Sequence, residues 1–204
     1  EVAAGDITIA TALMEARTLA GDDALLGRLA ALTGPEQIWP SAEFFRAKWD
    51  EQKARHRKFN NTEYNLEPNI TGCPGGLRDV QTVGWVAKRH FRAASTQELV
   101  ARGFLTEAEY QALARGQDFL WRVRYGLHML ADRAEDRLLF DYQLQLARLF
   151  GYADDERGLG VEHFMKDYFR CVLKLGVLNE MLTQLFDEAI LRACEPVNLY
   201  EINA

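Results

Sequence analysis

The sequence predicts a mainly α-helical fold, a helical bundle built from 204 residues. Several segments place apolar residues three, four and seven positions apart, which is the spacing of one buried helix face. Sequences typical of helix starts precede some of these segments. Nearly half of the residues (48%) are hydrophobic, so a packed core is expected. No internal repeat, low-complexity tract or long linker interrupts this pattern.

The first third of the chain contains three candidate elements. Residues 7–21 mix β-branched and helix-favouring residues, so their pattern fits either a buried strand or a helix. Residues 22–32 are helical in composition and end at a Thr-Gly-Pro stop signal, 33–35. Ser41 is expected to be the N-cap of a helix that runs to about Lys58.

The rest of the chain predicts four longer helices. The first begins near Leu77, and its apolar face is Leu77, Val80, Val83, Gly84, Ala87 and Phe91. Residues 95–98 and 106–109 both match a capping box, a Ser or Thr followed three positions later by Glu. The second box opens a helix whose buried stripe is Leu113, Leu120, Val123, Leu127 and Leu130. Another helix is expected at 142–150. The last follows Gly160, with a stripe of Val161, Phe164, Tyr168, Val172, Leu175, Leu178, Leu182 and Leu185. A coiled-coil partner would fit that stripe too, but packing within the chain is favoured.

The charge and composition argue against several classes of protein. The formal charge is −6, from 24 basic and 30 acidic residues, which argues against a general nucleic-acid binder. No apolar run approaches the ~20 residues of a membrane-spanning helix, and no signal-peptide pattern is present, so a cytoplasmic protein is expected. The three cysteines and four histidines are scattered, which argues against a disulfide framework and a zinc site.

A turn-rich segment, YNLEPNITGCPGGLRD, runs directly into the helix that begins near Leu77. A helix N-terminus presents free backbone N–H groups and a partial positive charge, which suits phosphate. Gly75 and Gly76 would let an anion approach that backbone, and Arg78 would add a bidentate donor. Asp79 would orient Arg78 or cap the helix. The alternative is an ordinary loop-to-helix connection.

Three further groups of residues are candidates with simpler explanations. Residues 46–59 are locally basic and could hold a polyphosphate, but such a run is more often the solvated face of a helix. In the sequence Trp-Arg-Val-Arg-Tyr, 121–125, we expect Trp121 and Val123 in the core with the arginines at its rim. Glu15 stands within an apolar segment, where a carboxylate is costly unless it is paired or binds a metal.

Taken together, these segments resemble the bacterial PII uridylyltransferase/uridylyl-removing family. The resemblance lies in YNLEPNITGCPGGLRDVQTVGWVAKRHF, FLWRVRYGLHMLADRAEDRLLFDYQLQLARLFGY, MKDYFRCVLKLGVLNEMLTQLFDEAI and TALMEARTLAGD, which together cover most of the chain. The Pro-Gly-Gly-Leu-Arg-Asp core is also similar to that of glutamine-synthetase adenylyltransferase. The flanking Tyr-Asn-Leu-Glu-Pro and Lys-Arg-His-Phe favour the PII family.

The resemblance implies a modular enzyme that transfers UMP from UTP to a tyrosine of the PII signal protein. It implies a polymerase-β-type nucleotidyltransferase domain, a helical domain, an HD hydrolase domain that removes the UMP, and ACT domains that respond to glutamine. Residues 1–34 would end the nucleotidyltransferase domain and include a short N-terminal strand. Residues 35–193 would be the helical domain, and 194–204 a linker toward the HD domain. The glutamine effector would act outside this chain.

The resemblance also implies roles for individual residues. Glu15 would be the third carboxylate of the catalytic Mg²⁺ site, and the loop before the helix would close over the nucleotide through Gly75, Gly76, Arg78 and Asp79. Thr71 stands where relatives often carry Lys, which removes one phosphate-binding charge. The family's Asp-x-Asp motif and His-Asp doublet are not in these residues. The chain alone is therefore expected to be inactive, with the other Mg²⁺ ligands upstream.

Two other functions remain open from the sequence. The chain could be a domain of an adenylyltransferase that uses ATP and modifies glutamine synthetase. It could also be a non-catalytic helical module that docks PII without contacting a nucleotide.

Overall fold

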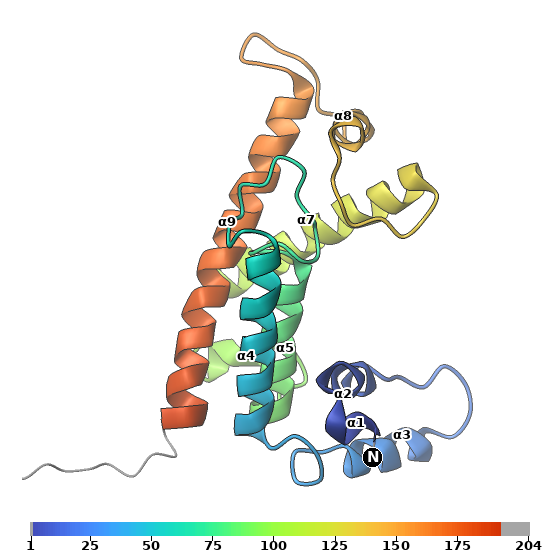
Figure 1. Cartoon of the computed structure of the whole chain (residues 1–204), viewed down its shortest axis with the longest axis vertical. Helices are drawn as coiled ribbons and strands as arrows, with labels where there is room; N and C mark the ends of the chain where they lie inside the picture. The colour runs from blue at the N-terminus through green and yellow to red at the C-terminus, as the bar shows by residue number, and fades with distance from the viewer. Residues whose placement is uncertain (1, 193–204) are drawn as a thin grey trace, which may run out of the picture.

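The computed structural model describes residues 2–192, which are mainly helical (Figure 1). The helices are α1 (Val2–Gly5), α2 (Ile7–Met14), α3 (Asp23–Leu32), α4 (Ser41–Lys58), α5 (Leu77–Phe91), α6 (Glu98–Ala101), α7 (Glu107–Ala131), α8 (Phe140–Leu149) and α9 (Gly160–Phe186), followed by a π-helical turn, η1 (Asp187–Leu191). In this part of the chain, β structure is limited to two isolated bridges, Asn69 with Arg137 and Asp155 with Gly158. The mainly α fold class is confirmed. The predicted linker at 194–204 and Cys194 lie outside the described residues.

The long helix α9 packs against elements from both the middle and the end of the chain. It contacts α5, α7, α8 and η1, and α4 packs against α5 beside it (Figure 1). The predicted stripe accounts for this, since Phe164, Tyr168, Val172, Leu175, Leu178 and Leu182 are all buried. The stripe is therefore used within the chain, as a helical bundle requires.

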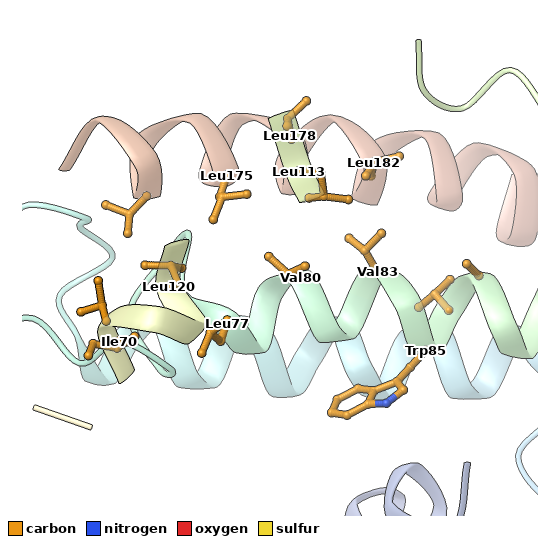
Figure 2. Packing of buried hydrophobic residues seen from close by; sticks show 14 of the residues in the cluster. Ile70, Leu77, Val80, Val83, Trp85, Leu113, Leu120, Leu175, Leu178 and Leu182 are labelled. Carbon is orange, nitrogen blue, oxygen red and sulfur yellow. The ribbon is translucent and has the colours of Figure 1, made fainter. Parts of the chain in front are cut away.

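The core lies where α5, α7 and α9 meet. Leu113 and Leu120 of α7 pack with Leu175, Leu178 and Leu182 of α9, all at most 2% exposed (Figure 2). Burying each leucine contributes about 1.5–3 kcal/mol. On α5, Val80 and Val83 point toward α9, whereas Trp85 points away from it (Figure 2). Helix α5 therefore has an inner face in the core and an outer face that carries Trp85.

The predicted helix starts were only partly correct. At the start of α7, Thr106 and Glu109 form the expected capping box. Ser41 is not the N-cap of α4, because Pro40 takes that position and no side chain caps the helix. At 95–98 the chain forms a turn rather than a capping box. There the Glu98 carboxylate accepts a hydrogen bond from the Ala94 N–H at 2.8 Å, and α6 begins only at Glu98.

The possible N-terminal strand is not found, because residues 7–14 form helix α2. The Asp6 side chain caps this helix by accepting a hydrogen bond from the Thr8 N–H at 2.7 Å. The Ala, Leu and Met residues after that cap favour a helix over a strand. Helix α2 ends at Glu15, so this carboxylate stands at a helix C-terminus.

A buried arginine connects the N-terminal helices to α5. Arg89 is 5% exposed and donates hydrogen bonds to the carbonyl oxygens of Thr33 (2.6 Å) and Trp39 (3.0 Å), and also to that of Ile38. These carbonyls belong to the turn between α3 and α4. Arg89 thereby fixes how that turn lies against α5. Among residues 2–192, no helix is long and apolar enough to cross a membrane.

Candidate functional site

The candidate residues lie at two places on α5, its N-terminal end and its outer face. Gly75, Gly76 and Asp79 are at the N-terminal end, where the loop at 59–76 joins the helix. Arg78 starts the outer face, which continues through Gln81, Trp85 and Lys88. Positions 78, 81, 85 and 88 are three or four residues apart, so they share one side of a helix.

The backbone N–H groups at this helix end have partners within the chain. The Gly75 N–H donates to the Asp79 carboxylate at 2.8 Å, and the Gly76 N–H to the Cys73 carbonyl at 2.9 Å. The Leu77 and Arg78 N–H groups donate to loop carbonyls at 3.0 and 3.1 Å. The Asp79 side chain thus occupies the place that we expected an anion to take. Nucleotide binding by Gly75 and Gly76 stays a prediction, and the contacts seen here are with the protein itself.

Gly75 is required by close packing against α9. It adopts a φ of +71°, and a Cβ atom built on it would lie 2.0 Å from the carbonyl oxygen of Val172. No side chain fits there, because real Cβ contacts are never this short. Asp79 then holds the Gly75 N–H from the first turn of α5, so the two residues join the loop, α5 and α9.

Asp79 is fully buried and is paired with α4 rather than with Arg78. The Arg55 guanidinium lies 2.9 Å from one carboxylate oxygen, and His56 Nε2 lies 3.0 Å from both. Arg55 Nη2 forms an ion pair with Asp79, but its geometry is not that of a hydrogen bond. Arg55 Nη1 donates a hydrogen bond to the Gly72 carbonyl at 3.1 Å. A buried carboxylate needs such partners to remain charged. Our expectation that Asp79 orients Arg78 is not what the structure shows.

Arg78 lies on the outer face against Trp85. Its guanidinium carbon is 5.3 Å from the centre of the Trp85 ring, and the Lys48 Nζ lies 4.6 Å from the same ring. Lys48 is 3% exposed and pairs with Glu51. Within residues 2–192, no carboxylate oxygen lies within 4.0 Å of Arg78. Arg78 therefore has its charge available for a ligand.

The charges around Arg78 leave a local positive surplus. Burial lowers the pKa of Lys48, and the charges of Arg78 and Arg55 lower it further, against the opposing effect of Glu51. Burial alone would raise the pKa of Glu51, but Lys48, Arg55 and Arg78 outweigh it and hold that pKa below its ordinary value. Arg55 also contacts Asp79, so three cations face two carboxylates, and an anion beside Arg78 would balance the remaining positive charge.

This cluster corrects the simple interpretation of the basic run at 46–59. Lys53 and Asp50 do form an exposed pair on the helix surface, at 3.1 Å. Lys48 and Arg55, in contrast, turn inward and contact α5 through Trp85 and Asp79. The run is therefore not simply a solvated face.

Glu15 meets the same outer face of α5. Its carboxylate accepts a hydrogen bond from Trp85 Nε1 at 3.0 Å, and Lys88 donates to the carbonyl of Met14 next to it. Trp85 thereby brings Glu15 and Arg78 together, although their roles were inferred independently. Glu15 itself is exposed, and it is not part of a metal-binding group. In residues 2–192, no three His, Cys, Asp or Glu side chains are placed to hold a metal ion.

Two of the cavities that adjoin α5 contain candidate residues, and Arg78 lines neither of them. A cavity of about 330 Å³ is lined by Glu15, Gln81, Trp85, Lys88, Gln117 and Trp121, among others. A groove of about 300 Å³ near α9 is lined by Lys53, His56, Gly75, Asp79, Glu63 and Glu180, among others. The groove sets three carboxylates against Lys53 and His56, which does not suit a polyphosphate. In the first cavity Glu15 is balanced by Lys88, and Trp85 in its wall contacts Arg78, so this cavity is the better candidate for a nucleotide.

The sequence analysis missed Trp85 and Lys88 as site residues, and it included Lys48 only as part of the basic run at 46–59. The available signal was the helical spacing of Arg78, Gln81, Trp85 and Lys88, which predicts one shared face. Nothing local predicts Lys48, because its contact with Trp85 joins two helices. Trp121 was also placed wrongly. Val123 is fully buried as expected, but Trp121 is 41% exposed and lines the cavity.

Comparison with known proteins shows that the segment containing most of these residues matches one protein family. The family model described as GlnD PII-uridylyltransferase matches residues 43–183. This range contains α4, α5 and α7 and therefore most of the residues around the cavity. The match decides against the adenylyltransferase family as the nearer resemblance. No solved structure was found to match.

Curated relatives extend the similarity over the whole chain. A bifunctional uridylyltransferase/uridylyl-removing enzyme of Ectopseudomonas mendocina (strain ymp) is 55% identical over 96% of this chain. Relatives with the same description from Pseudomonas aeruginosa (strain LESB58) and Azotobacter vinelandii (strain DJ) are 53% and 54% identical over 100% and 94% of it. The aligned region is only 21–23% of each relative. The chain thus spans about a fifth of the length of these relatives.

Proposed function

The chain belongs to the GlnD PII-uridylyltransferase family, and we propose that it is the helical part of an enzyme that transfers UMP from UTP to a tyrosine of PII. In this reaction the tyrosine oxygen bonds to the α-phosphorus and pyrophosphate leaves. The helical part binds and orients UTP, and residues outside this chain complete the catalytic site. The high identity to uridylyltransferases over the whole chain supports the reaction class.

The cavity beside Trp85 is the proposed nucleotide site. Arg78 has no carboxylate partner among the described residues and lies in a positively charged cluster, so it suits a phosphate oxygen. Trp85 fixes the position of the guanidinium on one side and of Glu15 on the other. The proposal rests mainly on one observation: Arg78 and Glu15 both contact Trp85, and Trp85 lines a cavity.

Residues 2–192 do not form a Mg²⁺ site by themselves. Glu15 offers a single carboxylate, one of whose oxygens already accepts the hydrogen bond from Trp85. Mg²⁺ typically takes one or two carboxylates together with substrate phosphates, in octahedral geometry. We propose that Glu15 contributes at most one ligand in the longer protein, and we derive no step through the metal.

Replacing Arg78 tests the nucleotide site. The protein for this test is the chain extended to the length of its relatives, assayed with PII and UTP. We expect Arg78→Ala to lower kcat/KM for UTP about 10- to 100-fold, because a charged hydrogen bond contributes about 1.5–3 kcal/mol. The control is Arg46→Ala on α4, an exposed arginine that we expect to be neutral.

The outcomes of this test separate the competing functions. Equal kcat/KM values for UTP in the two variants would contradict the nucleotide site. A loss of PII affinity in Arg78→Ala without any change toward UTP would favour the non-catalytic docking module instead. Turnover with ATP and glutamine synthetase, but not with UTP and PII, would favour the adenylyltransferase function.

A further inference from the structure

The outward side of α7 carries large apolar side chains that the fold leaves uncovered. Trp121, Tyr125 and Met129 are 41%, 70% and 60% exposed. They are four residues apart, so they form a single row on the helix surface. We call these three residues the α7 stripe. The opposite side of α7 is buried in the core through Leu120, Val123 and Leu127 among others, so the stripe is not needed for packing within the described chain.

The composition of the α7 stripe is that of a protein-binding surface. Trp, Tyr, Met and Arg are enriched where proteins bind each other, and Trp, Tyr and Arg supply many of the strongest contacts. Arg124 lies 5.5 Å from the centre of the Trp121 ring and is held by Asp136 at 2.7 Å. Arg122 lies 5.9 Å from the ring centre of Phe150 on α8. The guanidinium groups of Arg122 and Arg124 therefore lie beside the apolar row, as at many interfaces.

The α7 stripe is continuous with the proposed nucleotide site. Trp121 lines the same cavity as Glu15, Trp85 and Lys88. From Trp121 the row runs to Met129 over about 12 Å, at 1.5 Å per residue. A macromolecule whose reactive residue enters the cavity would thus lie across Tyr125 and Met129. A small molecule in the cavity would reach only Trp121.

We propose that the α7 stripe is the docking surface for the protein substrate, PII in the function proposed above, on which this inference rests. The substrate places its tyrosine at the cavity, and its body covers Tyr125 and Met129. The Arg122 side chain at the edge of the row favours a partner with acidic residues around its contact area, whereas the charge of Arg124 is already paired with Asp136. The stripe therefore sets the affinity for the protein substrate and not the affinity for the nucleotide.

The test is a double variant, Tyr125→Ala with Met129→Ala, in the chain extended to the length of its relatives. Initial rates are measured against PII at saturating UTP, and against UTP at saturating PII. We expect KM for PII to rise about tenfold or more, since removing central interface side chains commonly has effects of this size. KM for UTP, kcat and the melting temperature should stay unchanged. Val177→Ala, at a 63% exposed apolar residue on α9, is the control.

Each contrary outcome has a separate meaning. An unchanged KM for PII would overturn the docking surface while leaving the proposed function intact. A higher KM for UTP with an unchanged KM for PII would show that the α7 stripe contacts the nucleotide, which also overturns the inference. A clearly lower melting temperature would show that another part of the protein covers the row, which also overturns the inference. If the unmodified protein does not uridylylate PII at all, the proposed function itself fails, and the docking inference with it.

Discussion

At the scale of single residues, the side chains at the start of α5 serve two different purposes. Asp79 and Gly75 hold the loop, α4, α5 and α9 together, whereas Arg78, next to Asp79 in sequence, turns to the outer face. Adjacent helix residues point about 100° apart, so the pair is divided between a structural network and a ligand-facing surface. The sequence indicates that these residues matter, but it does not separate their roles.

Replacing Asp79 should therefore act on stability. Asp79→Asn keeps an acceptor for the Gly75 N–H but leaves the Arg55 charge without its buried partner. We expect the free energy of unfolding to fall by about 3 kcal/mol, the lower end of the range for breaking a buried pair, because Arg55 keeps its contact with Glu51. Urea denaturation followed by circular dichroism measures the change.

Asp50→Asn is the matched control for that variant. Asp50 also pairs with a basic residue of α4, Lys53, but its side chain is 75% exposed. Exposed pairs contribute roughly 0–1 kcal/mol, so this variant should be nearly neutral. Similar losses in the two variants would show that the Asp79 network does not stabilise the fold.

At the scale of elements, the sequence predicts those helices whose buried face or cap is encoded within a few turns. It does not predict which helices contact each other. The stripe of α9 and the capping box of α7 are both encoded within a few turns of sequence, and both were predicted correctly. Trp121 was misplaced because its immediate neighbour Leu120 takes the inward position. The segment at 7–14 was ambiguous because its β-branched residues obscured a helix that Asp6 caps.

The junction of α5 with α9 gives a test at this scale. Gly75→Ala would force a Cβ atom against the Val172 carbonyl and a side chain into a left-handed backbone conformation. We expect a loss of about 3 kcal/mol or more in the free energy of unfolding, from overpacking and backbone strain together. Thermal and urea unfolding measure it.

The control for the junction is Gly27→Ala in α3, where nothing lies within 4 Å of an added Cβ atom. Alanine should be neutral or more stable there by about 0.5–1 kcal/mol, because glycine weakens a helix interior. If both glycine variants change stability in the same direction and by similar amounts, the close contact between Gly75 and α9 is not a real constraint.

At the scale of the whole molecule, the described chain is a helical scaffold in which α9 packs against α5, α7, α8 and η1, and the candidate site lies on the face of α5 that is turned away from α9 (Figures 1 and 2). The bundle and the family were predictable, because both rest on long stretches of sequence. The site was predictable only in part. Arg78 and Glu15 were candidates from their sequence context and from the resemblance, but the tryptophan that joins them is recognised only once the end of α2 meets α5.

The arrangement explains how one face can serve a transfer between a nucleotide and a protein. Trp85 lines the cavity and contacts Arg78, and the α7 stripe extends from the cavity through Trp121. The carboxylates for a metal ion are not grouped in residues 2–192. In our proposal the helical part therefore positions both substrates, and a neighbouring domain supplies the chemistry of transfer.

The most direct test of this account uses labelled UTP, Mg²⁺ and PII. Transfer of label to PII is compared between the 204-residue chain and the same chain extended upstream through a nucleotidyltransferase domain. We predict no labelling by the chain alone and labelling by the extended protein, since in our proposal the scaffold orients the substrates and residues 2–192 group no metal ligands. An extended, folded protein that fails to label PII from UTP would contradict the account, and so would transfer by the chain alone.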